Sequence, residues 1–113
     1  CIRDSSQAIE YNGVLYVSGQ IPVNPESGAV EAETIEGQAE QSLKNVGAIL
    51  KESGLTYENV LKTTCFIADM GDFAKFNEVY AKYFKEDAPA RSCVAVKDLP
   101  KGVLCEVEVV AGK

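Results

Sequence analysis

Short runs of apolar and β-branched residues along the chain predict five β-strands. Runs of this kind, bounded by turn residues, are typical of strands, and they cover residues 7–11, 14–20, 60–68, 92–96 and 103–110. The first two runs flank Asn12-Gly13, a pair that favours a two-residue hairpin turn because both residues tolerate a positive φ. Residues 21–28 contain two prolines, which cannot donate to a sheet, so this segment is predicted to be a loop.

A longer periodic segment over residues 34–53 predicts an α-helix. Its apolar residues recur every three or four positions and form one stripe, which consists of Ile35, Ala39, Leu43, Val46 and Leu50. Thr34 is expected to cap the helix N-terminus, where the acidic Glu36 complements the positive end of the helix dipole. Gly54 is expected to end the helix.

A second helix is predicted over residues 73–84, and one of its faces is aromatic. The residues of this face recur at helical spacing and are Phe73, Phe76, Asn77, Tyr80, Tyr83 and Phe84. Asp72 is the expected N-terminal cap. Asn77 is polar where an apolar residue is expected, so either the stripe ends there or its side chain points into a pocket.

The predicted elements follow the order β-β-α-β-α-β-β. No linker, internal repeat or low-complexity stretch divides the chain, so we expect a single domain over residues 1–113. Its fold class is α/β, an α+β sandwich in which the two helices cover one face of a β-sheet. A turn around Pro100 and Gly102 is expected to join the last two strands.

The composition narrows the classes of partner. Seventeen acidic residues against eleven basic ones give a net charge of −6, and no basic cluster is present, so we expect no nucleic-acid partner. No apolar stretch is long enough to span a membrane, and we expect a cytoplasmic protein, or an organellar one if a presequence has been removed. The four cysteines lack paired metal-binding spacing, so we expect free thiols and no cysteine-bound metal.

The chain contains no histidine. This absence excludes Ser-His-Asp and Cys-His hydrolysis, His-ligated zinc and His-based acid/base pairs. Any catalysis must therefore use carboxylates, Arg, Lys, Tyr, Cys, hydroxyls, backbone amides and water.

Arg91 and Glu106 are the strongest candidates for a functional pair. Arg91 is one of only two arginines, and Glu106 lies on a predicted strand that can fold back beside it. A guanidinium binds a carboxylate through two parallel hydrogen bonds, and a carboxylate held nearby can position or deprotonate a water molecule. The pair therefore predicts a site for a small carboxylic acid.

Both residues also have a purely structural interpretation. Arg91 could be an exposed cation that pairs with the excess of acids, since most arginines are exposed. Glu106 could be a solvated acid on a strand face, and the two-residue period places Glu108 on the same face, so periodicity alone does not choose between them.

Three further residues are candidates for the site. Cys93 could be a nucleophile with a pKa lowered by Arg91, but without a nearby histidine a packing role is favoured. The small residues Ser18 and Gly19 would permit close approach of the backbone to a ligand, although they could equally form an ordinary strand end.

The motifs that carry these residues resemble those of the RidA family, the reactive intermediate deaminases, also called YjgF-type proteins and formerly endoribonuclease L-PSP. They occur in collinear order over essentially the whole chain and are Ser18-Gly19-Gln20-Ile21-Pro22, Lys62-Thr63-Thr64, Phe76-Asn77-Glu78-Val79-Tyr80, Pro89-Ala90-Arg91-Ser92-Cys93 and Leu99-Pro100-Lys101-Gly102. The resemblance implies a chorismate-mutase-like fold and a homotrimer with three sites in the clefts between subunits. It also implies cofactor-free hydrolysis of 2-enamine or 2-imine acids, such as 2-aminoacrylate and 2-aminocrotonate, to 2-keto acids and ammonia.

The resemblance also implies a role for each candidate. Arg91 would hold the substrate carboxylate, with the backbone amide of Cys93 as an additional donor. Glu106, rather than Glu108, would orient the attacking water. The residues that line the pocket or its edge would be Ser18, Gly19 and Asn77.

The chain departs from the family pattern near its N-terminus and around the candidate acid. Family members usually carry Gly-Pro-Tyr-Ser-Gln-Ala where this chain has residues 3–8, so Ser5 stands in place of a tyrosine that reaches the pocket. Cys105 and Val107 flank Glu106 where the family prefers larger aliphatic residues. These departures leave open a second hypothesis, in which the pocket binds 2-keto acids without turnover. A third, RNA cleavage, is disfavoured by the negative charge and the absence of histidine.

Overall fold

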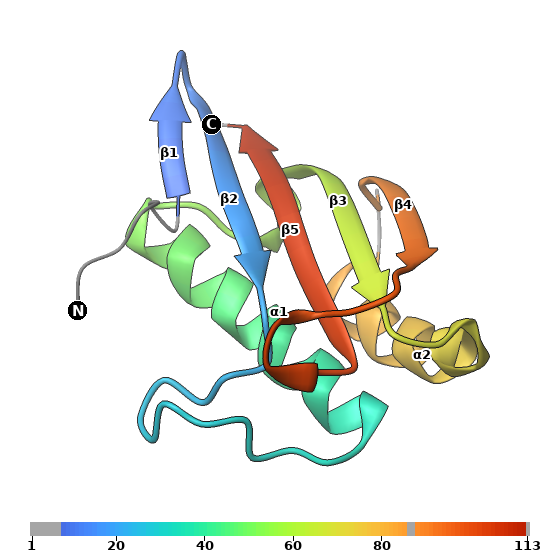
Figure 1. Cartoon of the computed structure of the whole chain (residues 1–113). Helices are drawn as coiled ribbons and strands as arrows, with labels where there is room; N and C mark the ends of the chain where they lie inside the picture. Colours follow the sequence, from blue (N-terminus) through green and yellow to red (C-terminus); the bar gives the residue numbers. More distant parts are fainter. Residues whose placement is uncertain (1–7, 86–87, 113) are drawn as a thin grey trace.

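A computed structural model describes residues 8–85 and 88–112 of the chain. Their elements confirm the predicted order and are β1 (Ala8–Tyr11), β2 (Val14–Gln20), α1 (Ile35–Glu52), β3 (Val60–Ile67), α2 (Phe73–Tyr83), β4 (Ala90–Ala95) and β5 (Cys105–Gly112), with short 3₁₀ turns η1 (Tyr57–Asn59), η2 (Met70–Asp72) and η3 (Pro100–Gly102) (Figure 1). The predicted strand residue Gln7 and the family position Ser5 lie outside the described residues.

The five strands form one mixed sheet in the order β1-β2-β5-β3-β4. β3 and β4 pair in parallel because the chain between them passes through α2, and a helical crossover is what a parallel pair requires. β5 pairs antiparallel with both β2 and β3. The expectation that the last strand folds back beside the arginine-bearing strand is therefore wrong, because β3 lies between β4 and β5.

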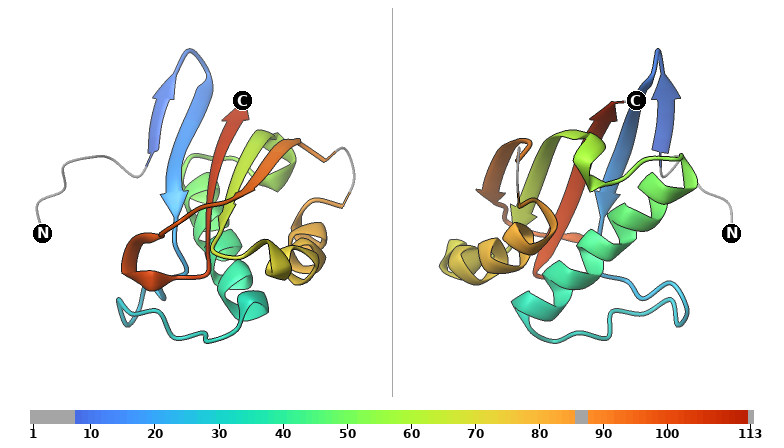
Figure 2. Two further views of the ribbon diagram at one scale, coloured as in Figure 1. Left: turned by 45° about the vertical axis from the view of Figure 1, so that its right-hand side comes forward. Right: turned by 180° about the vertical axis from the view of Figure 1, so that it is seen from behind.

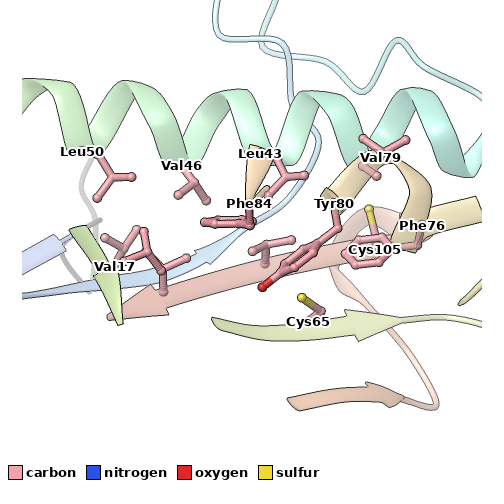
Figure 3. Close-up of a cluster of buried hydrophobic side chains, with 14 of the residues drawn as sticks. Val17, Leu43, Val46, Leu50, Cys65, Phe76, Val79, Tyr80, Phe84 and Cys105 are labelled. Atoms are coloured by element: carbon pink, nitrogen blue, oxygen red, sulfur yellow. The ribbon is translucent and has the colours of Figure 1, made fainter. Parts of the chain in front are cut away.

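Both helices pack on the same face of the sheet, as predicted (Figure 2). The Thr34 side chain caps α1 by accepting a hydrogen bond from the Gly37 amide at 3.1 Å, and every residue of the predicted apolar stripe is buried. Alternate residues of β5 are buried against the helices. The resulting core joins α1, α2 and the sheet (Figure 3), and its fully enclosed members include Leu43, Val46, Phe76 and Val107.

The predicted cap of the second helix is not formed. Asp72 stands at the N-cap position of α2, but its side chain makes no capping hydrogen bond, because the preceding turn η2 leads directly into the helix and gives Asp72 a helical backbone. Asp69 instead caps the preceding turn η2, where its side chain accepts a hydrogen bond from the Gly71 amide at 2.8 Å.

Within residues 8–85 and 88–112, no helix packs on the second face of the sheet, called the uncovered face below, and it carries large apolar side chains (Figure 2). Ile9 and Tyr16 lie opposite each other on β1 and β2 and are 60% and 50% exposed. Val94 of β4 and Leu61 of β3 are also exposed. In the described ranges neither helix combines the length and apolar composition that a membrane span requires.

Candidate functional site

Arg91 lies within β4, which begins two residues earlier than predicted. It is the register partner of buried Thr63, so its side chain lies on the helix-covered face. There the guanidinium Nη1 donates a hydrogen bond to Asn77 Oδ1 at 2.7 Å. The Arg91 Cζ also lies 4.5 Å from the centroid of the Tyr80 ring and 5.5 Å from that of Phe73. Three residues of α2, namely Phe73, Asn77 and Tyr80, therefore contact the guanidinium.

The recorded partners of Arg91 among the described residues are an amide and two aromatic rings, none of which is a carboxylate. Among the described residues, these contacts with α2 differ from those of an exposed cation paired with surplus acids, and Arg91 is half-buried. A guanidinium has five N–H donors, and the Asn77 bond uses one of them. The remaining donors suffice for a two-point hydrogen bond to an external carboxylate. Asn77, whose polar character was unexplained in the sequence, points to Arg91.

Cys93 lies two residues further along the same edge strand, opposite Cys65 on β3. Burial raises the pKa of the Cys93 thiol, and the nearby Arg91 charge opposes this rise only in part. The hypothesis of a lowered thiol pKa is therefore wrong, and the side chain packs against the core.

The backbone of β4 offers a donor at this position. Val96 N–H donates to Ile67 O of β3 at 2.9 Å. Because backbone groups of successive strand residues point to alternate sides, the amides of Arg91 and Cys93 point away from β3, toward the free edge of the sheet. The arginine side chain and an unpaired edge amide are thus available along one strand.

Glu106 lies on the uncovered face of the sheet, opposite Phe66 of β3. Its side chain is half-buried, and burial together with the neighbouring Glu108 charge raises the pKa of the Glu106 carboxyl. The predicted sharing of one face by Glu106 and Glu108 is confirmed by the register. A carboxyl with a raised pKa exchanges protons closer to neutral pH than an ordinary one.

Gly19 has no side chain, and this leaves room for the Glu106 carboxylate beside β2. Between Val17 and Gln20 the register of β2 against β5 shifts by one residue, which is a β-bulge. A Cβ atom at position 19 would overlap the Glu106 carboxylate and lie 2.6 Å from its Cδ. The expected close approach at Ser18-Gly19 is therefore made by the protein's own acid, and exposed Ser18 lies next to it on the strand.

The candidate residues form two separate groups in one chain. We call Arg91, Asn77 and the Cys93 amide the clamp, and Ser18, Gly19 and Glu106 the acid group. The clamp uses the helix-covered face and the outer edge of β4, whereas Glu106 projects from the opposite face two strands away. A single chain therefore does not bring the two groups together.

The contacts of the clamp include residues that the sequence assigned only to packing. Tyr80 and Phe73 were predicted as members of an aromatic helix face, and Thr63 as part of a strand. Phe73 lies four residues before Asn77 and Tyr80 three residues after it. This helical spacing was the one signal in the sequence that the two aromatic residues share the surroundings of Asn77. Their contact with Arg91 depends on how α2 packs against β4.

Comparisons with known proteins find relatives that match this chain over most of its length. The model of the family Endoribonuclease L-PSP matches residues 2–113. "Putative regulator AldR" of Lactococcus lactis is 52% identical over 100 residues, covering 88% of this chain and 79% of that protein. Reactive Intermediate Deaminase A, chloroplastic, of Arabidopsis thaliana is 47% identical over 106 residues, covering 94% of this chain and 57% of that protein. The crystal structure of E. coli TdcF with bound serine superposes with a TM-score of 0.93 at 41% identity, covering all of this chain and 91% of that one, and its likeness confirms the predicted fold.

Proposed function

This chain belongs to the endoribonuclease L-PSP (RidA) family, and we propose that it hydrolyses reactive 2-enamine and 2-imine acids to 2-keto acids and ammonia. The observation that carries the proposal is the state of Arg91. Its guanidinium is held by Asn77 and two aromatic rings, and none of these recorded partners is an anion. A pre-oriented guanidinium with unused donors is suited to a small carboxylate.

A complete site requires two copies of the chain, and we propose a homotrimer with three sites between subunits. The clamp of one subunit would face the acid group of the next, which resolves their separation on opposite faces of one sheet. Exposed apolar side chains on the uncovered face favour its burial between copies, notably Ile9, Tyr16 and Val94. Ser18 and Glu108 also line a hollow of about 280 Å³ on this side.

The proposed reaction requires only a group that carries protons and a group that positions the substrate. The enamine form tautomerises to the imine, and water adds across its C=N bond while one proton passes from that water to the nitrogen. The hydroxyl proton of the resulting carbinolamine then moves to its amino group, so that the C=O bond forms as the C–N bond breaks, and ammonia and the keto acid are released. Glu106 would accept a proton from the oxygen and deliver it to the nitrogen in each of these two steps, a task for which its raised pKa is favourable. Arg91 would hold the carboxylate beside the reacting carbon, so that water attack becomes a positioned step.

Two relatives support the substrate class. One, Reactive Intermediate Deaminase A, carries the activity in its name. Another, TdcF, was crystallised with serine, an α-amino acid whose carboxylate has the geometry required by the clamp. The name of AldR favours a second candidate, in which the same pocket senses a small carboxylic acid without turnover.

The test is hydrolysis of 2-aminoacrylate and 2-aminocrotonate, generated in situ from serine and threonine by a dehydratase. We expect the protein to accelerate keto-acid formation, Arg91→Ala to abolish the acceleration, and Lys97→Ala, which removes an exposed cation just beyond β4, to retain it. Binding of 2-oxobutanoate by a folded wild-type protein that gives no acceleration would select the sensing function instead.

A further inference from the structure

Tyr80 occupies a position between the clamp and the sheet that its packing role alone does not explain. Its ring lies under the Arg91 guanidinium, at 4.5 Å from Cζ, within the range of a cation–π contact. Its hydroxyl hydrogen-bonds the hydroxyl of Thr63 at 2.8 Å, and both residues are buried. Figure 3 shows the ring reaching from α2 toward the sheet, with its hydroxyl directed at the strand that carries Cys65.

Thr63 is also the register partner of Arg91 on the neighbouring strand. The Tyr80 ring is therefore fixed at two ends, by the backbone of α2 and by a hydroxyl that is placed beside Arg91. The Phe84 ring, at 4.7 Å between centroids, packs against Tyr80 as well. A ring held in this way presents a fixed face to the guanidinium.

The orientation of the guanidinium matters because a carboxylate binds it through two parallel hydrogen bonds in the plane of the group. The Asn77 bond fixes one corner, at Nη1, and leaves rotation about that corner open. The Tyr80 face restricts this freedom, since the cation–π contact keeps the guanidinium over the ring, with Cζ 4.5 Å from its centroid.

We propose that Tyr80, anchored by the Thr63 hydroxyl, is a positioning residue that fixes the plane of the Arg91 guanidinium for two-point binding of the substrate carboxylate. The substrate role in this inference rests on the proposed function, whereas the ordering of Arg91 does not. Tyr80 acts through Arg91 and touches no reacting atom.

The first experiment measures the order of the Arg91 side chain by the ¹⁵N heteronuclear NOE of its Nε–H group. The chain has only two arginines, so Arg3→Lys assigns the signal. We expect the NOE to fall in Tyr80→Leu, and to fall less in Tyr80→Phe and Thr63→Val, each of which removes one partner of the same hydroxyl pair. Val79→Ala, which truncates a buried apolar side chain of the same helix next to Tyr80 in sequence, is the matched control and should leave the signal unchanged.

The second experiment measures the dissociation constant of 2-oxobutanoate and the KM and kcat of deamination. We expect Tyr80→Leu to raise the dissociation constant and KM about tenfold with kcat within about twofold, because the contact serves ground state and transition state alike. Tyr80→Phe and Thr63→Val should each raise them about threefold, and the double variant should be no worse than either.

An Arg91 signal as ordered in Tyr80→Leu as in the wild type would overturn the positioning role. Equal losses in Val79→Ala and Tyr80→Leu would also overturn it, since the effect would then be general loosening of α2. If wild-type protein neither binds nor deaminates the substrates, the proposed function fails, and the Arg91 signal still decides whether Tyr80 orders the guanidinium.

Discussion

Two inactive variants should restore activity to each other when they share a trimer. Arg91→Ala removes the clamp and Glu106→Gln removes the acid, and each is expected to abolish deamination as a pure protein. The clamp and the acid group lie on opposite faces of one sheet, separated by β3. Under the proposed function, each active site would then combine the clamp of one subunit with the acid group of its neighbour.

The magnitude follows from cyclic symmetry. In a cyclic trimer every interface pairs the front of one subunit with the back of the next. Any trimer that contains both variants, in either ratio, has one interface where an intact clamp meets an intact acid group. Purified mixed trimers should therefore show about one third of the wild-type kcat, with KM unchanged, because the surviving site has wild-type residues.

The assay uses the two variants with different affinity tags, co-expressed and purified over both tags in turn, followed by keto-acid release from 2-aminocrotonate. Single-variant trimers carrying both tags are the control and should remain inactive. Mixed trimers with no activity, obtained with wild-type mass and stability, would show that each site is built within one chain and would refute the shared site. A monomeric mass in solution would refute the homotrimer directly.

Three further outcomes follow from the same geometry. Gly19→Ala should lower kcat at least about tenfold while 2-oxobutanoate binding persists, because the added Cβ would displace the Glu106 carboxylate and leave the clamp intact; loss of binding by isothermal titration would contradict this. The pH–rate profile should have an acidic limb displaced upward from the usual range of a glutamate carboxyl, since burial and the Glu108 charge raise the pKa of Glu106 and its base form is lost as the pH falls through that raised pKa, and Glu106→Gln should remove the limb. Cys93→Ala should keep kcat and KM within about twofold, because the donor at this position is the backbone amide and burial raises the pKa of the thiol; inactivation of this folded variant would restore the nucleophile hypothesis.

Local pattern was sufficient to predict the elements, as the particular residues show. The stripe from Ile35 to Leu50 is buried at every predicted position, because a periodic apolar face has no other stable place than the core. Asn12 and Gly13 adopt the positive φ values that the hairpin turn needs. These features depend on neighbours within a few residues of one another, which a sequence displays directly.

The arrangement of the strands could not be read in the same way. The alternation along β5 fixes which of its residues face the helices but not which strands lie beside it, since any neighbour with the same buried face would satisfy the pattern. The apparent proximity of Arg91 and Glu106 in sequence therefore suggested a pair of neighbouring strands, whereas β5 lies between β2 and β3. The contacts of Arg91 with Asn77 and Tyr80 depend on the packing of α2 and are equally invisible in the sequence.

The separation of the two groups is a consequence of register and not of loop conformation. On β3, Arg91 pairs with Thr63 and Glu106 pairs with Phe66. Thr63 and Phe66 are an odd number of positions apart, and side chains an odd number of positions apart on a strand point to opposite faces. No rearrangement of the turns at either end changes this parity, because a slip of one residue would turn the buried set of β5 outward. The same alternation that builds the core thus places Glu106 and the clamp on opposite sides of one sheet, and the proposed site, which uses both, would form where two copies of the chain meet.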